Sequence, residues 1–251
     1  MPQSRVYQTE AIIIKRTKLG EADRILTLFT PEFGKIRAVA KGTRRPQSKL
    51  GGHVELLTHS RLQLAHGRNL DIITQAQTIE SFMPLKNDLS LMSCGLYLSE
   101  LIDAFTAEDV EAGQLFILFC DMLHQLEQTD NRDTLLRYFE LQVFNLTGYR
   151  PQLQRCASCN TLLEPITNSF CANQGGVICP ECTLTEPSAR PLSLNALKVL
   201  RLWQNCSYDT AHKVNINSTL SLELEQILRE YIKYILDRQI KSTEWLDKLK
   251  Y

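Results

Sequence analysis

The sequence Cys156-Ala-Ser-Cys159, followed after nineteen residues by Cys179-Pro-Glu-Cys182, decides the organisation of this chain. Each Cys-x-x-Cys pair folds into a tight knuckle that directs two thiolates at one tetrahedral ion, and two such pairs at this spacing match the zinc-ribbon pattern. We therefore predict that the four cysteines bind one Zn²⁺ ion. Four thiolates leave no position for water, so the predicted role of the metal is structural rather than catalytic.

Two other interpretations of the cysteines stay open. Two disulfides would need an oxidising compartment, but residues 1–8 lack the apolar core of a signal peptide, and we expect the protein to remain in a reducing cytoplasm. Cys171 lies between the pairs and could replace one ligand. A lone cysteine lacks the knuckle that preorganises its thiolate, so we expect Cys171 to pack as a small side chain.

The cysteine segment is bounded by Pro151 and Pro187 and contains few large apolar side chains. Hydrophobic burial alone is not expected to hold so short a piece together. A structural zinc contributes on the order of 10 kcal/mol in small metal-stabilised units. We therefore expect the metal to be the core of residues 151–187.

The composition is that of an ordinary globular protein, with 251 residues of which 43% are hydrophobic and 22% charged. No apolar run approaches the roughly 18 residues of a membrane span, so we expect no membrane association. The formal net charge is zero, but residues 1–80 carry thirteen Lys or Arg against seven Asp or Glu, a balance of +6, and the remainder carries −6. This asymmetry predicts an anionic partner for the N-terminal region.

Residues 7–80 are typical of short strands separated by turn signals. Pro31 and Gly34 flank a predicted turn, and no helix long enough for a parallel crossover occurs. The predicted strands are Ala11–Ile14, Ile25–Phe29, Lys35–Lys41, Val54–Leu57, Ser60–Leu64 and Asp71–Ile79. We predict a small antiparallel barrel of the OB type over residues 1–82.

After Pro84 the apolar residues recur at helical spacing, as in Tyr97, Leu101 and Phe105. The other predicted helices are 115–126, 134–146 ended by Gly148, one capped by Ser193 that runs through Trp203, and 222–240. The predicted fold class is α+β multidomain. It consists of the barrel and a helical domain, 83–251, into which the zinc ribbon, 151–187, is inserted.

The sequence contains no motif that would indicate an enzyme. His-Glu-x-x-His, Gly-x-Ser-x-Gly and the phosphate-binding Gly-x-x-x-x-Gly-Lys-Ser/Thr are all absent, and the five histidines are dispersed. We therefore expect a protein without catalytic residues.

Basic residues concentrate on one predicted strand and the loop that follows it. Residues 43–49 contain breakers and no packing residues, which predicts a mobile basic loop. In OB barrels a cationic strand face and loop follow the phosphates of single strands while aromatic side chains stack with bases. Of the nearby aromatics, we expect Tyr7, Phe29 and Phe33 to pack in the core. The candidate DNA-binding residues are Arg24, Lys35, Arg37, Lys41, Arg44, Arg45 and Lys49.

The chain resembles the bacterial recombination mediator family RecO over nearly its whole length. Three regions agree in order and spacing. The matching segments are Lys18-Leu-Gly-Glu-Ala-Asp-Arg-Ile-Leu, Thr27-Leu-Phe-Thr, Phe33-Gly-Lys, Val39-Ala-Lys-Gly-Thr-Arg-Arg, Gly95-Leu-Tyr-Leu-Ser-Glu-Leu, Leu136-Arg-Tyr-Phe-Glu-Leu, Leu146-Thr-Gly-Tyr-Arg-Pro and Gly175-Gly-Val-Ile-Cys-Pro-Glu-Cys.

This resemblance implies a DNA-repair function in the cytoplasm, associated with the nucleoid. The implied partners are single- and double-stranded DNA, RecR, the acidic C-terminal tail of single-strand binding protein and, indirectly, RecA. The implied activity is annealing of complementary strands and loading of RecA, with RecR, onto DNA coated by single-strand binding protein. The alternative is a zinc-ribbon adaptor that binds protein or RNA without annealing activity.

Overall fold

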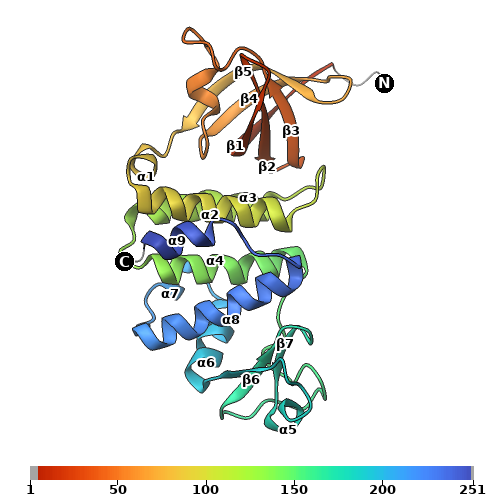
Figure 1. Cartoon of the computed structure of the whole chain (residues 1–251), viewed down its shortest axis with the longest axis vertical. Coiled ribbons are helices and arrows are strands. Elements are labelled where there is room, and N and C mark those ends of the chain that lie inside the picture. The colour runs from red at the N-terminus through yellow and green to blue at the C-terminus, as the bar shows by residue number, and fades with distance from the viewer. Residues whose placement is uncertain (1–4, 250–251) are drawn as a thin grey trace. The chain divides into compact units, whose positions relative to one another are not determined.

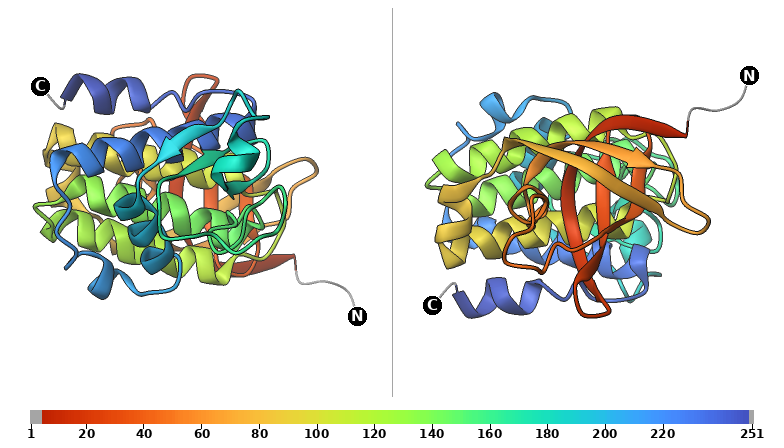
Figure 2. Two further views of the ribbon diagram at one scale, coloured as in Figure 1. Left: turned by 90° about the horizontal axis from the view of Figure 1, so that it is seen from below. Right: turned by 90° about the horizontal axis from the view of Figure 1, so that it is seen from above.

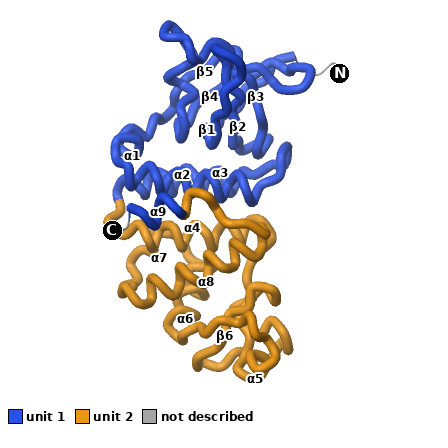
Figure 3. The backbone as a smooth tube through the Cα atoms, in the orientation of Figure 1, with its two compact units in different colours: residues 1–128, 244–251 blue, residues 129–243 orange. Residues whose placement is uncertain are grey.

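The computed structural model describes residues 5–249, which form two compact units (Figure 3). Unit 1 comprises residues 1–128 and 244–251, and unit 2 comprises residues 129–243. The segment 83–128, expected within the helical domain, belongs to the unit that contains the barrel. None of the helices between residues 5 and 249 is long and apolar enough to cross a membrane.

Unit 1 contains a closed five-stranded barrel with the strand order β1-β2-β3-β5-β4 (Figures 1 and 2). Neighbouring strands are antiparallel except β3 and β5, which pair in parallel at Ala38↔Asp71 and Val39↔Ile72. This arrangement confirms the predicted OB-type barrel. The strands are β1 (Val6–Leu19), β2 (Asp23–Thr30), β3 (Gly34–Ala40), β4 (His59–Ala65) and β5 (Asp71–Glu80).

The long first strand closes the barrel because it pairs with two neighbours. Its first half pairs with β4 from Val6 to Ile12, and a register shift between Ile13 and Lys15 precedes its pairing with the beginning of β2. Such a bulge bends a strand enough to let it continue around a small barrel. Alternate residues then face inward, and the barrel core includes Leu26, Leu28 and Leu64, each fully buried.

The prediction of a strand over Val54–Leu57 is wrong. A 3₁₀ helix, η1 (Gly51–Val54), occupies its beginning, and Leu57 has a left-handed backbone with φ of 58°. Val54 and Leu57 are nonetheless completely buried, and Val54 belongs to the barrel core. The apolar pattern therefore correctly indicated burial, but adjacent glycines at 51 and 52 favour a turn over an extended strand.

The helical part of unit 1 packs closely on the barrel. Its helices are α1 (Met83–Asn87), α2 (Leu89–Phe105), α3 (Gly113–Gln128) and, from Glu244 onward, α9 (Thr243–Leu249). The α2–α3 loop contacts the β2–β3 turn at Gly34, which has φ of +59°, and a Cβ atom there would lie 1.8 Å from the carbonyl oxygen of Val110. Only glycine satisfies both the backbone angle and this contact.

Unit 2 is built from α4 (Arg132–Thr147), α6 (Leu194–Trp203), α7 (Tyr208–Ala211) and α8 (Ser218–Leu236). The predicted ends of two helices are confirmed. Ser193 caps α6 by accepting a hydrogen bond from the Ala196 N–H group, and Gly148 ends α4 with φ of 87°. The helix predicted over 222–240 instead runs from 218 to 236, because Asn217 caps its beginning and Asp237 takes a left-handed conformation.

The cysteine module of unit 2 consists of the sheet β7-β6-β8 and one short helix (Figure 1). Its elements are β6 (Asn168–Cys171), β7 (Gly176–Ile178), α5 (Pro180–Thr183) and β8 (Arg190–Leu192). Phe170 is buried with its ring centroid 5.3 Å from that of Tyr231 on α8. The module thus also has an apolar anchor on the helices, and the expectation that metal is its core is incomplete.

Candidate metal centre and nucleic-acid interface

The four pair cysteines converge at one point of the module. Their Sγ atoms all lie within 4.8 Å of one another, and Cys159 Sγ lies 3.8 Å from Cys179 Sγ. Four sulfurs about 2.3 Å from a tetrahedral zinc lie about 3.8 Å apart, whereas a disulfide requires about 2.05 Å. All eight cysteines are free thiols. The cluster therefore fits a four-sulfur metal site, and none of its cysteines forms a disulfide in this structure.

Hydrogen bonds lower the pKa of two of the four thiols, Cys156 and Cys159, whereas the pKa of Cys182 is raised. Burial acts to raise the pKa of Cys156, yet that pKa is lowered because the N–H groups of Cys159 and Cys179 donate to its sulfur, at 3.5 and 3.3 Å. The Thr161 hydroxyl, 3.3 Å from Cys159 Sγ, lowers the pKa of Cys159 to about 6. Stabilised thiolates of this kind are the form that binds a metal ion.

Cys171 lies outside this cluster. Its side chain is completely buried, and its thiol donates to Asn173 Oδ1 at 2.7 Å. The four sulfurs of the pairs already supply a full tetrahedral set. Cys171 therefore packs as the sequence predicted.

The basic loop after β3 is attached to the β1–β2 turn. The Gly42 N–H group donates to Asp23 Oδ1 at 2.7 Å, the Arg44 N–H group donates to the Ala22 carbonyl at 3.0 Å, and the Arg44 guanidinium donates to the Gly20 carbonyl at 3.2 Å. These bonds bring the loop and the turn to the same end of the barrel. The side chains of Lys41, Arg44, Arg45 and Lys49 are exposed there.

Two further cations face each other at this end. Lys18 and Arg24 are directly opposite in the β1–β2 pairing. Like charges at opposed positions repel each other, and an anion between or beside them relieves the repulsion. Arg24 has one carboxylate nearby, Glu55, at 3.4 Å, which Arg16 also pairs with. We name this surface, made of Lys18, Arg24, Lys41, Arg44, Arg45 and Lys49, the basic end.

Lys35 and Arg37 do not share the environment expected of them. Lys35 is only 9% exposed, and its ammonium lies 3.2 Å from Asp103 Oδ1 and donates to the Asp103 carbonyl at 2.6 Å. A lysine engaged in this way joins β3 to α2 and is not available to a phosphate. Arg37, on the same strand face, is exposed and lines a cavity described below.

Of the aromatic side chains expected in the core, Phe29 is buried and Phe33 is exposed. Phe29 is completely buried against Phe116 and Phe119 of α3, as expected of a core residue. Phe33 is 40% exposed, and its ring meets Tyr7 at 5.0 Å. Because β3 and β5 pair only at two positions, the start of β3 borders an open seam. No local pattern in the sequence indicates this seam, because it depends on where β5 begins.

These features define the class of protein: an OB-barrel protein with a basic barrel end and a four-cysteine module that fits metal binding. The chain matches the family description "Recombination protein O N terminal" over residues 3–82 and "Recombination protein O C terminal" over residues 86–244.

Curated relatives agree over the whole chain. The chain is 38% identical to "DNA repair protein RecO" of Dehalococcoides mccartyi strain 195 over 249 residues, which cover 99% of this chain and 98% of the relative. It is 40% identical to "DNA repair protein RecO" of Roseiflexus sp. strain RS-1 over 248 residues, which cover 99% and 87% of the two chains. The chain therefore belongs to the RecO family of DNA repair proteins.

Proposed function

We propose that this protein is a non-enzymatic recombination mediator of DNA repair that binds single- and double-stranded DNA through the basic end of its barrel. It anneals complementary strands and acts with RecR to load RecA onto DNA covered by single-strand binding protein, whose acidic C-terminal tail it contacts. The observation that carries the proposal is the basic end itself, where exposed cations from the β1–β2 ribbon and the loop after β3 are held together by the Gly42 and Arg44 hydrogen bonds.

The electrostatics of this surface suit a polyanion. Phosphates bind arginine forks and lysine ammonium groups without base readout, as annealing of arbitrary sequences requires. Of the residues expected from the sequence, Arg24, Lys41, Arg44, Arg45 and Lys49 belong to the proposed DNA surface, with Arg37 at its margin. Lys35 is left out because Asp103 holds it.

The metal of the cysteine cluster is proposed to be one Zn²⁺ ion, since four thiolates in a tetrahedral arrangement favour zinc over oxygen-preferring cations. When bound, zinc would supply structural stability and no reaction. Reduced cysteines and a DNA-repair role also favour a cytoplasmic location at the nucleoid.

The experiment is annealing of complementary fluorescent strands, bare and coated with single-strand binding protein. The wild-type chain should accelerate annealing in both cases. The variant R44A/R45A/K49A should anneal several times more slowly, while D121N/D130N, changed at exposed positions outside the basic end, should match the wild type. A wild-type chain that binds protein partners but never accelerates annealing would instead identify the adaptor function.

A further inference from the structure

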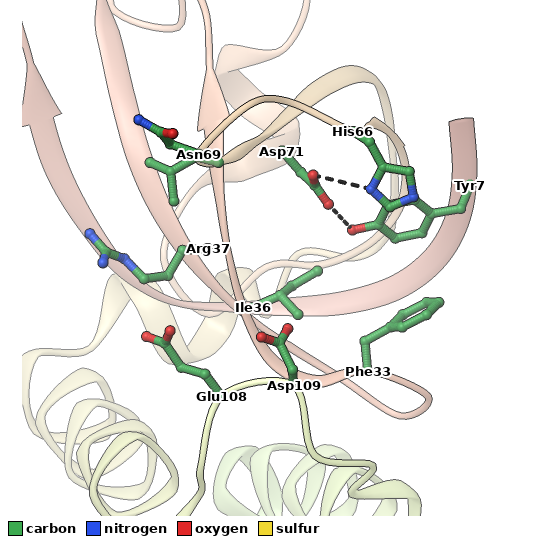
Figure 4. A pocket seen from close by; sticks show the side chains of 10 residues that line it. Tyr7, Phe33, Ile36, Arg37, His66, Asn69, Asp71, Glu108 and Asp109 are labelled. Carbon is green, nitrogen blue, oxygen red and sulfur yellow. Dashed lines mark hydrogen bonds and ion pairs between the residues drawn. The ribbon is translucent and has the colours of Figure 1, made fainter. Parts of the chain in front are cut away.

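An open cavity of about 640 Å³ lies in unit 1 at the seam between β3 and β5. Its walls come from the first residues of β1, the β2–β3 turn, the β4–β5 loop and the α2–α3 loop (Figure 4). The residues that carry the argument are Tyr7, Phe33, His66, Asp71, Glu108 and Asp109. We call this site the seam pocket.

One wall of the seam pocket is a fixed group of rings. Tyr7 stacks on His66 with centroids 4.9 Å apart, and Phe33 meets Tyr7 edge-on at 5.0 Å. Asp71 fixes the first two rings, because its carboxylate accepts the Tyr7 hydroxyl at 2.6 Å and lies 3.3 Å from His66 Nδ1 (Figure 4). A rigid aromatic wall binds a flat or cationic group with little loss of side-chain entropy.

The facing wall carries two exposed carboxylates on a fixed loop. Glu108 forms a parallel bridge with Lys35, the Asp109 N–H group donates to the Lys35 carbonyl at 3.1 Å, and the same loop packs on Gly34. Figure 4 shows both carboxylates rising from the loop toward the barrel. Within residues 5–249 neither carboxylate lies within 4.0 Å of a basic side chain.

The charge of the seam pocket is opposite to that of the basic end. Among the described residues that line it, Arg37 is the one Lys or Arg, against the carboxylates of Asp71, Glu108 and Asp109. A DNA backbone that followed this surface would bring phosphates toward three carboxylates, which costs free energy. The lining therefore disfavours nucleic acid and favours a cation that can also use the rings.

We propose that the seam pocket binds an arginine side chain of a basic segment on a protein partner. A guanidinium is planar and stacks on an aromatic face, where the ring quadrupole attracts it. Its fixed fork of N–H donors matches carboxylates such as Glu108 and Asp109. The pocket is thus a protein-docking site next to the DNA surface, and it allows DNA and a basic partner to be held at the same time.

The test is a titration of the full-length, ¹⁵N-labelled chain, followed by NMR, with the peptide acetyl-Gly-Arg-Arg-Gly-amide. Saturable shifts should appear at the amides of residues 66–71 and 108–110 and weaken as salt is raised. The neutral peptide acetyl-Gly-Gln-Gln-Gly-amide should produce none. Absence of saturable shifts with the arginine peptide overturns the proposal, and so do shifts at these amides produced by a thymidine or guanosine oligonucleotide but not by the peptide.

Two variants test the carboxylate wall and the aromatic wall of the seam pocket separately. E108Q/D109N should weaken peptide binding about fivefold or more, because two charge-assisted contacts are lost. F33L keeps an apolar side chain without a ring quadrupole and should weaken it about two- to fivefold. D121N/D130N, which removes the same charge elsewhere, should leave peptide binding unchanged. An equal loss with D121N/D130N overturns the proposal, because it shows that only net charge matters.

The outcome is independent of the proposed DNA function. R44A/R45A/K49A should leave peptide binding unchanged, and E108Q/D109N should leave annealing of bare strands unchanged or faster. If the peptide titration fails while annealing persists, the seam pocket is not an arginine site and the DNA function stands.

Discussion

Lys35 and Arg45 belong to one basic stretch of sequence but have different physical roles. Lys35 is nearly buried and bound to Asp103, whereas Arg45 is exposed at the basic end. Removing Lys35 deletes a nearly buried ion pair and hydrogen bond, which lowers the free energy of unfolding more than losing an exposed surface charge does, although Asp103 keeps its ion pair with Lys15.

We therefore predict that Lys35→Ala lowers the free energy of unfolding by about 2 kcal/mol and leaves DNA affinity unchanged at temperatures where the protein is folded. Arg45→Ala should lower DNA affinity and change the unfolding free energy by less than about 0.5 kcal/mol. Urea unfolding and fluorescence anisotropy with a labelled single strand measure the two quantities. An equal loss of DNA affinity in both variants would show that Lys35 belongs to the DNA surface.

Lys86 makes the stability of unit 1 depend on pH. Burial lowers its pKa from 10.5 to about 8, and its ammonium donates to the Thr58 hydroxyl at 2.6 Å. Because the folded pKa is below the unfolded one, the unfolded chain binds more protons between pH 8 and 10.5, and stability rises with pH through that window. Below pH 8 both states are protonated, and the cost of burying the charge is fully present.

Relative to Lys86→Met, the wild type should gain about 1 to 2 kcal/mol of unfolding free energy between pH 7.5 and 10. The gain is smaller than the full pKa difference implies, because the side chain is only half buried and solvent screens its charge. Urea midpoints of both proteins at the two pH values measure it. A pH response identical in wild type and variant would show that Lys86 does not cause it.

At the scale of elements, the cysteine module combines a four-cysteine knuckle that fits a metal ion with an apolar anchor. The knuckle contains the four cysteines, and the anchor is the contact of Phe170 with Tyr231. Each part stabilises a different side of the module, so we expect metal loss to unfold it only locally.

We predict one zinc per chain in the wild type and in Cys171→Ser, and none in Cys159→Ser. The reason is that Cys171 lies outside the sulfur cluster and Cys159 within it. Metal analysis gives the stoichiometry, and the cobalt-substituted protein should show the absorption of four sulfur ligands. In hydrogen exchange, chelation should expose residues 156–161 and 179–184 well before β6. Loss of zinc from Cys171→Ser would refute the assigned ligand set.

The sequence predicted elements best where one local signal determines them. Ser193 and Gly148 mark helix ends by capping chemistry alone, and the cysteine spacing identifies the four residues whose sulfurs converge. The strand prediction for Val54–Leu57 is wrong because a buried turn and a buried strand can have the same apolar sequence pattern. The roles of Lys35 and Tyr7 were not predictable, since each depends on a residue more than sixty positions away, Asp103 and Asp71 respectively.

At the scale of the whole molecule, the charge asymmetry of the sequence has a measurable consequence for DNA binding. Residues 1–80 have a balance of +6, and the sequence predicts seven DNA-binding cations among them. Lys35 is not available, and Glu55 lies 3.4 Å from Arg24, so about five of the six cations of the basic end contact phosphate. Each phosphate contact releases condensed counterions, so the number of contacts sets the salt dependence of affinity.

We predict that the logarithm of single-strand affinity falls with the logarithm of salt concentration with a slope of about −3.5, a loss of about a hundredfold between 50 and 200 mM salt. In R44A/R45A/K49A the slope should shrink to about −1.4, because three contacts are gone, while K35A keeps the wild-type slope. Anisotropy titrations of one oligonucleotide at four salt concentrations measure all three slopes. If the slope of the triple variant equals that of the wild type, the phosphates follow another surface, and the basic end is not the DNA site.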